Sequence, residues 1–161
     1  MNLYILQIIT PVVKPIGSFC YNPTMSLSDN DQQLIATAKA TINTFSIPGG
    51  KIGYVGAALR TKEGAIYKGV SLHLVCGLGF CGEANAIANA LTEAGPIQID
   101  TIVSANPTGI ISPCGRCREL MNVLADDSDE TWVIVSENEK LQLKDLLPRP
   151  WKPTPDTENK V

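Results

Sequence analysis

The chain has 161 residues, of which 44% are hydrophobic and 18% charged, a composition typical of one globular domain. Its net charge is −3 and its 13 lysines and arginines are spread along the sequence, so a nucleic-acid partner is not expected. The apolar opening lacks a basic start and contains Pro11 and Pro15, so neither a secretory signal nor a membrane-spanning helix is expected. Five cysteines, an odd number, favour metal binding in a reducing cytoplasm over disulfides.

The two ends of the chain differ in composition from its middle. Residues 1–25 show no helical or strand period, and Met25 stands directly before a well-formed domain start. Two interpretations stay open: an extension ahead of a native start at Met25 rather than Met1, or an N-terminal arm that packs on the domain or on a neighbouring subunit. Residues 152–161 are rich in proline and polar residues and are expected to be disordered. The predicted domain therefore occupies residues 26–151.

The first half of this domain predicts a helix followed by a β-hairpin. A capping-box pattern at Ser28 begins the helix, and apolar residues then recur at helical spacing as far as Phe45. Residues 54–61 and 65–74 favour strands, and the short connection between them contains glycine.

The second half alternates helices and strands. This order predicts an α/β domain of three layers (α/β/α), with a mixed central sheet covered by helices on both faces. The expected elements are a helix from Cys81 to near Gly95, a strand over 99–105, a loop over 106–113, a helix bearing Cys117, and strands over 131–136 and 141–143.

Two cysteine motifs stand where a loop is expected to enter a helix. The first begins at Cys81, and the second is the Pro-Cys-Gly-Arg-Cys of 113–117. Cys114 and Cys117 can bind one ion from the same side, and Cys81 supplies a third thiolate. Three protein ligands leave the fourth position of a tetrahedral zinc open for water, which is the arrangement of a catalytic site. We therefore predict one Zn²⁺ per chain.

Glu83 lies two residues after the first ligand, near enough to reach zinc-bound water without binding the metal itself. Zinc lowers the pKa of its water to about 7, and a base must still take the proton and return it. Three thiolates leave excess negative charge, which the N-terminal ends of two helices and Arg116 are expected to offset. The alternatives are a structural zinc or a redox pair for the cysteines, and a solvated helix-start carboxylate for Glu83.

These motifs resemble those of the zinc-dependent cytidine deaminase superfamily, in which Cys/His-x-Glu occurs with Pro-Cys-x-x-Cys. The similarity covers residues 26–151 and is strongest to the small cytidine deaminases and their blasticidin S deaminase relatives, through 81–83, 111–118 and the helix over 34–42. It implies hydrolytic deamination of a cytosine-containing nucleoside at C4, with ammonia released and Glu83 as the catalytic residue. It also implies a homotetramer in which loops of neighbouring subunits complete each site.

The substrate contacts are where this sequence departs from that family. Ordinary cytidine deaminases hold the ribose with Asn-x-Glu, where this chain has Ser71 and His73, and many place arginine where it has Ala84. A missing polar partner lowers binding by ~1–3 kcal/mol, so a modified nucleoside is expected to be preferred over plain cytidine. The expected substrate-binding residues are Ser71, His73, Gly82 and Trp151.

Several alternatives stay open. His73 and Trp151 are equally compatible with purely structural roles, and Cys20 and Cys76 are expected to be small buried or loop residues. The protein could also keep the zinc and bind a nucleoside without turnover, although the retained Glu83 opposes this. Deamination of a polynucleotide base is opposed by the acidic charge and the few aromatic residues.

Overall fold

The structure is a computed structural model, and it describes residues 26–151. The segments set apart by their composition, 1–25 and 152–161, lie outside the described residues, and so do Cys20 and the question of the native start. Within the described residues, no helix is both long enough and apolar enough to cross a membrane.

A capping box begins the first helix, as the sequence predicts. Helix α1 covers Asp29–Thr41; the Ser28 side chain accepts a hydrogen bond from the backbone N–H of Asp31, and the Asp31 carboxylate accepts one from the N–H of Ser28 at 2.9 Å. The helix packs against one face of the sheet through a cluster of buried apolar residues: Leu34, Ile35, Ala38, Ala58, Val103 and Ile134.

The end of this helix differs from the expectation. The apolar period runs on to Phe45, but Ile42 has an extended backbone (φ −61°, ψ 119°) and ends the helix. Phe45 instead lies in a short strand, β1 (Phe45–Ile47), which pairs with the start of β2 (Gly50–Thr61). The apolar spacing of residues 34–45 therefore does not show where the helix ends, because the side chain of Phe45 is exposed and does not have to lie on the buried face of α1.

Within residues 26–151, seven strands form one mixed sheet. Strands β2 and β3 form the predicted hairpin, and β4 pairs with β2 antiparallel and with β6 parallel. The order is β1-β2-β4-β6-β7, with β3 paired to β2 and β5 paired to β4. The strands not yet given are β3 (Ile66–Leu74), β4 (Ile99–Asn106), β5 (Gly109–Ile111), β6 (Trp132–Ser136) and β7 (Glu139–Gln142).

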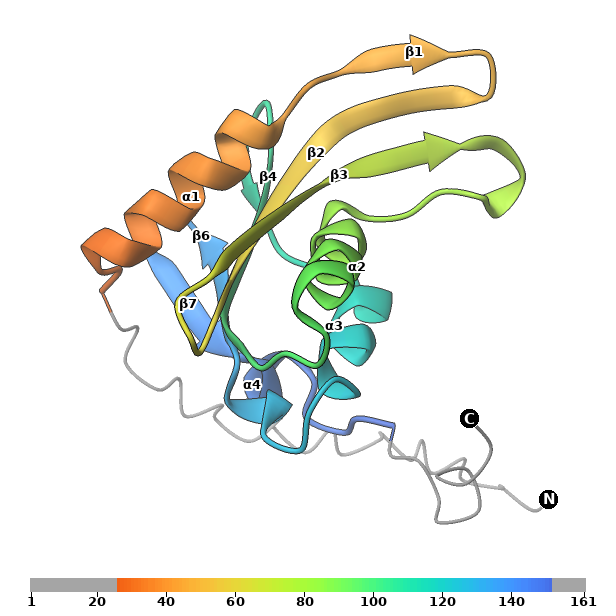
Figure 1. Ribbon diagram of the computed structural model, residues 1–161. Coiled ribbons are helices and arrows are strands. Elements are labelled where there is room, and N and C mark those ends of the chain that lie inside the picture. The colour runs from red at the N-terminus through yellow and green to blue at the C-terminus, as the bar shows by residue number, and fades with distance from the viewer. Residues whose placement is uncertain (1–25, 152–161) are drawn as a thin grey trace, which may run out of the picture.

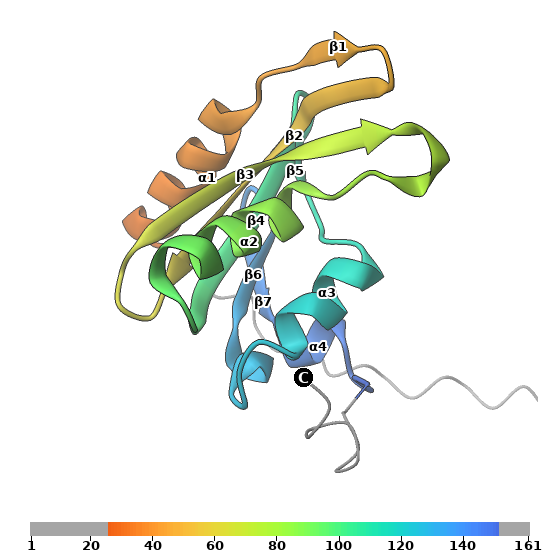
Figure 2. The same cartoon turned by 45° about the vertical axis from the view of Figure 1, so that its right-hand side comes forward.

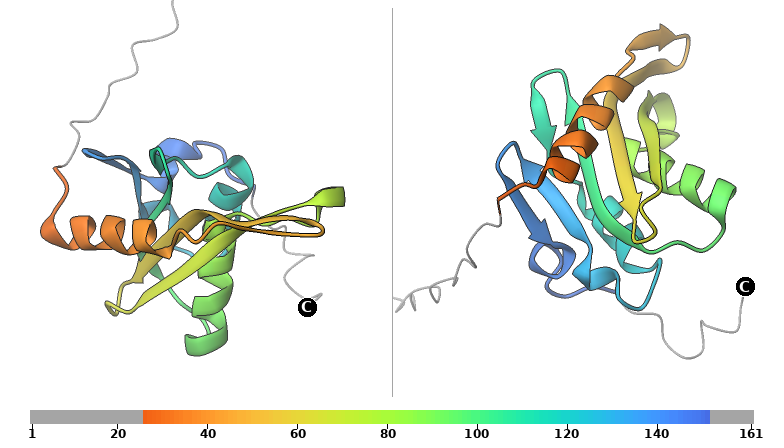
Figure 3. Two further views of the ribbon diagram at one scale, coloured as in Figure 1. Left: turned by 90° about the horizontal axis from the view of Figure 1, so that it is seen from above. Right: turned by 60° about the vertical axis from the view of Figure 1, so that its left-hand side comes forward.

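Helices cover both faces of this sheet, so the predicted three-layer α/β/α fold is confirmed. Helix α1 lies on one face, and α2 (Gly82–Ala94) and α3 (Gly115–Asn122) lie on the other (Figures 1 and 3). Helix α2 packs on the sheet through Ala86, Ile87 and Ala90, within the larger apolar cluster. The remaining short elements are α4 (Leu143–Leu146) and two 3₁₀ turns, Val75–Gly77 and Ser128–Glu130.

Two glycines let the helices approach the sheet closely. A Cβ on Gly69 of β3 would stand 2.3 Å from the backbone nitrogen of Ala86 in α2, and one on Gly56 of β2 would stand 2.3 Å from the carbonyl oxygen of Ala38 in α1. Neither position has room for a side chain. The start of α2, which carries two of the predicted site residues, is therefore held directly against the hairpin.

Candidate active site

The structure brings the three predicted ligands together at the starts of two helices. Cys81 precedes the first residue of α2, Cys114 precedes the first residue of α3, and Cys117 lies in the first turn of α3. Helices α2 and α3 are neighbours on one face of the sheet (Figure 2). The three sulfur atoms all lie within 4.8 Å of one another, and the Sγ atoms of Cys81 and Cys114 are 3.6 Å apart.

This spacing fits a zinc ion. Two thiolates bound at ~2.3 Å in a tetrahedral arrangement stand roughly 3.8 Å apart. The observed separation of 3.6 Å between two of the sulfurs is close to that value. The donor set and its geometry therefore suit a tetrahedral metal with three sulfur ligands.

The three thiols differ in the direction in which their surroundings shift the pKa. Burial raises the pKa of Cys117 and of Cys81 above the ordinary thiol value. Burial would also raise the pKa of Cys114, but hydrogen bonds from the backbone N–H of Cys117 and from the neighbouring thiols lower it overall. A bound cation would favour the thiolate form of all three cysteines, and their sulfur atoms are close enough together to hold one metal ion.

Glu83 lies in the first turn of α2 and is only 4% exposed. Its Oε1 lies 3.1 Å from the Oγ of Ser104, which can donate a hydrogen bond either to this carboxylate or to the carbonyl oxygen of Ile111 at 3.0 Å. A solvated helix-start carboxylate would be exposed, so the burial of Glu83 argues against that alternative. Ser104 was not expected from the sequence, where its one signal is a hydroxyl within the apolar stretch of residues 102–105.

A hollow of about 270 Å³ opens beside the cysteines and Glu83. This volume is near the lower end of the range for small-ligand sites. Three of the four residues expected to bind substrate line the hollow: Ser71, His73 and Gly82. The other lining residues are Val55, Leu72, Gly79, Phe80, Cys81, Glu83, Ile111, Ser112 and Cys114.

The polar side chains of this pocket differ in exposure. Ser71 is buried, and its Oγ accepts a hydrogen bond from the backbone N–H of Val55 at 2.9 Å, which leaves the hydroxyl hydrogen for another acceptor. His73 is exposed at the rim, with its ring centroid 6.0 Å from that of Tyr54. At Gly82 an added Cβ would contact the Cβ of Ala57 at 3.2 Å, so a side chain would crowd the base of the pocket.

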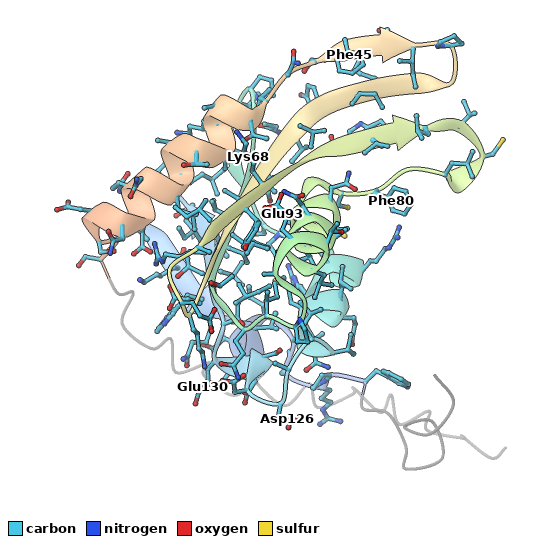
Figure 4. The ribbon with its side chains drawn as sticks, viewed as in Figure 1. Phe45, Lys68, Phe80, Glu93, Asp126 and Glu130 are labelled. Carbon is cyan, nitrogen blue, oxygen red and sulfur yellow. The ribbon has the colours of Figure 1, made fainter. Side chains whose placement is uncertain are left out.

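Arg116 contacts an aromatic ring. Its guanidinium carbon lies 5.4 Å from the ring centroid of Phe80, a partly exposed residue that lines the pocket. Phe80 projects beside α2 (Figure 4). Among the hydrogen bonds of residues 26–151, none joins Arg116 to a thiol. Its expected action on the thiolates is therefore limited to the charge it places at the mouth of the site.

Arg118, which sequence analysis did not single out as a site residue, fixes the second cysteine loop. Its Nε donates to the carbonyl oxygen of Pro113 at 2.9 Å, and its Nη1 donates to that of Leu146 in α4 at 3.0 Å. The residue before Cys114 is thereby tied to the C-terminal part of the domain.

Trp151 lies away from this pocket within the chain. Its backbone N–H donates to the carboxylate of Glu119 at 3.2 Å, and its carbonyl oxygen accepts from the side-chain amide of Asn122 at 3.1 Å. Its side chain borders a second hollow beside the end of α3 and α4. A role in closing a substrate pocket would have to involve the pocket of a neighbouring subunit.

The three-layer α/β/α domain thus places three thiols that could hold a metal ion, together with a buried glutamate, at the starts of two helices. No family model matches the chain. It is 33% identical over 138 residues to the blasticidin-S deaminase of Bacillus cereus, covering 78% of this chain and 94% of that protein. It is also 36% identical over 99 residues to the cytidine deaminase of Shewanella sp. (strain W3-18-1), covering 60% of this chain and 29% of that longer protein.

The solved structures with a similar fold are also cytidine deaminases. The cytidine deaminase of Burkholderia pseudomallei matches with a TM-score of 0.63 and 28% identity, covering 78% of this chain and all of that chain (100%). The cytidine deaminase of Mycobacterium tuberculosis has the same fold, with a TM-score of 0.65 over 76% of this chain and 97% of that chain. The chain belongs to the cytidine deaminase superfamily.

Proposed function

We propose that this protein is a zinc-dependent aminohydrolase that converts a cytosine-containing nucleoside to its uracil form, with release of ammonia. The observation that carries the proposal is the buried Glu83 in the same pocket as Cys81 and Cys114, whose sulfur atoms lie within 4.8 Å of that of the buried Cys117. Membership in the cytidine deaminase superfamily supports the same reaction.

In this mechanism Cys81, Cys114 and Cys117 hold one zinc ion. When bound, zinc supplies Lewis-acid activation of water by lowering its pKa. Glu83 accepts a proton as the water oxygen adds to C4 of the cytosine ring, and donates one to N3. The second proton of that water, which is on the C4 hydroxyl once the oxygen has added, is carried by Glu83 to the exocyclic amine, and the amine leaves as ammonia while the C4 carbonyl forms.

The pocket walls determine how the substrate lies. Phe80, Ile111 and Leu72 provide apolar surface for the base, and the free hydroxyl hydrogen of Ser71 can donate to a substrate oxygen. His73 at the rim is placed to contact the sugar side of the nucleoside. Arg116 stacked on Phe80 adds positive charge at the opening, which supports a substrate that carries negative charge or several acceptors there.

A second candidate substrate is blasticidin S itself. The Bacillus cereus relative carries that name, and it aligns over 94% of its length. The histidine and serine at 73 and 71, where other cytidine deaminases place a carboxylate and an amide, support a modified nucleoside over plain cytidine. The corresponding roles are antibiotic resistance for blasticidin S and pyrimidine salvage for cytidine or deoxycytidine.

The proposal includes a homotetramer located in the cytoplasm. Large apolar side chains stay exposed along β1 and after β3, which supports burial against further copies of the chain: Phe45, Ile47, Val75, Leu78 and Phe80. The four cysteines among the described residues are all free, and a three-thiolate site needs a reducing compartment.

A substrate series tests the proposal. Zinc-loaded protein is offered cytidine, deoxycytidine and blasticidin S, and deamination is followed by absorbance and by ammonia release. We expect turnover of at least one of them, with kcat/KM for cytidine lower than for blasticidin S by roughly 10-fold or more, from the missing polar partner. The matched variant His73→Glu should recover part of the activity on cytidine. If none of the three is deaminated by protein that holds one zinc per chain, the proposed function is wrong.

A further inference from the structure

One buried serine on β4 contacts both the proposed proton carrier and the adjacent strand. Ser104 is 1% exposed, and its Oγ lies 3.1 Å from Oε1 of Glu83 and 3.0 Å from the carbonyl oxygen of Ile111. An ionised carboxylate and a carbonyl oxygen are both acceptors, so the hydroxyl is the donor to each. Its single hydrogen can serve only one of them at a time.

We propose that Ser104 is a positioning residue for Glu83, an inference that rests on the proposed deamination. Glu83 lies on the first turn of α2 and Ser104 on β4, so their hydrogen bond ties the start of the helix to the sheet beside the pocket. Ser104 itself is not among the residues that line the pocket. It therefore acts on the reaction through Glu83 and not by contact with the substrate.

The pair of acceptors gives a reason for a hydroxyl at this position. Donation from Ser104 to Oε1 of Glu83 holds one carboxylate oxygen and leaves Oε2 for the pocket, and the carbonyl oxygen of Ile111 is a second acceptor on the adjacent strand. A buried polar group is costly when unpaired, so a residue without a hydroxyl here would leave Oε1 of Glu83 without this donor.

The competing explanation is purely structural: Ser104 would only join β4 to β5 through the carbonyl oxygen of Ile111. In that case its removal would lower stability without a selective effect on the chemical step. The two explanations therefore differ in kcat and in whether the effect of the mutation depends on Glu83.

The kinetic test compares Ser104→Ala with Ser104→Thr and with the control Thr101→Val. Thr101 is a buried hydroxyl on the same strand that contacts Asp100 and Arg60 instead of Glu83. For Ser104→Ala we expect kcat to fall about 10- to 100-fold with KM changed by less than about twofold at equal zinc content. Ser104→Thr, which keeps the hydroxyl, should restore much of kcat, and Thr101→Val should lower the unfolding midpoint while leaving kcat unchanged.

A double-mutant cycle in urea supplies a readout that does not depend on turnover. If the hydrogen bond couples the two residues, Ser104→Ala lowers the unfolding midpoint less in a Glu83→Ala background than in the wild type. Equal shifts in both backgrounds, or wild-type kcat in the Ser104→Ala protein, would overturn the inference. A wild-type protein without turnover would instead reject the proposed deamination and the catalytic role built on it, whatever the cycle shows.

Discussion

At the scale of single residues, the surroundings of Glu83 and of the three cysteines determine the chemistry that this site can carry out. A charged carboxylate is rarely buried unless it is hydrogen-bonded, and Glu83 has both the Ser104 hydroxyl and the positive end of α2 beside it. The three cysteines form a second group, and burial and hydrogen bonding give their thiols different pKa values. Among these three cysteines, Cys114 has a lowered pKa while burial raises the pKa of Cys81 and Cys117, so a bound cation would favour the thiolate form of the latter two.

Replacing one ligand should remove the metal. We expect Cys114→Ser to lose most of its zinc and all measurable deamination, because hydroxyl is a far weaker zinc ligand than thiolate. The matched control is Cys76→Ser, since Cys76 is an exposed free cysteine outside the sulfur group. The zinc content per chain of both variants, measured by inductively coupled plasma mass spectrometry after dialysis, checks the prediction. Full zinc occupancy in Cys114→Ser would contradict this assignment.

A buried ion pair far from the site predicts the acid sensitivity of the fold. Asp31 is fully buried; burial would raise its pKa, but hydrogen bonds from Lys140 at 2.7 Å and from Ser28 lower it below the ordinary 3.8. A lowered native pKa stabilises the fold above pH 3.8, and this contribution is lost as pH falls through the native value. We expect Asp31→Asn to lower the free energy of unfolding by about 3 kcal/mol at pH 7.

The control for this prediction is Asp29→Asn in the same helix turn, where the side chain is exposed. It should cost less than about 1 kcal/mol. Urea unfolding at several pH values measures both, and the gap between wild type and Asp31→Asn should shrink below pH 3.8. A gap that stays constant down to strongly acidic pH would show that the ionised carboxylate does not stabilise the fold.

At the scale of elements, the close contact between α2 and the hairpin determines where Glu83 lies. We expect Gly69→Ala to push α2 away from β3, because the new Cβ would meet the Ala86 nitrogen at 2.3 Å. The variant should lose ~1–3 kcal/mol of stability and also lower kcat/KM. Gly49→Ala is the control, since a Cβ there meets nothing within 4 Å. Thermal unfolding and steady-state kinetics should separate the two, and a fully active, stable Gly69→Ala would contradict the account.

Long, strongly patterned elements could be predicted from the sequence, while short ones could not. The capping box at Ser28, the hairpin, α2 and the cysteine helix were all predicted from local pattern. Strands β1 and β5 have three residues each, too few for a period of two to be visible, and depend on pairing with β2 and β4. Residues 106–113 were therefore expected to be a loop, and the first two residues of β7, Glu139 and Lys140, were missed.

The candidate site was predictable only in part, for a similar reason. Metal ligands and a base have specific residue types at fixed spacing, so the cysteines and Glu83 stood out. Ser104 and Phe80 are common residue types that gain their roles from the packing of distant elements. The sequence showed that Ser71 and His73 differ from the residues of ordinary cytidine deaminases, but not that Ser71 is buried while His73 is exposed.

At the scale of the whole molecule, the projecting end of the hairpin is the least covered region. Strand β1 and the adjoining ends of β2 and β3 extend beyond the helices (Figure 1). Phe45 is 49% exposed there and Leu78 after β3 is 63% exposed. We expect light scattering with gel filtration to give the mass of a tetramer, and Phe45→Glu to shift it to smaller species, with Lys68→Glu as an exposed control. A monomeric wild type would contradict the proposed assembly.

We propose that Glu83 moves protons beside a zinc ion held by Cys81, Cys114 and Cys117. Ammonia release by wild type and Glu83→Gln at equal zinc content, on the nucleoside that the wild type turns over best, tests this role. We expect one zinc per chain in both proteins and a loss of at least ~100-fold in kcat for the variant. A Glu83→Gln protein with near wild-type kcat and a full zinc complement would contradict it.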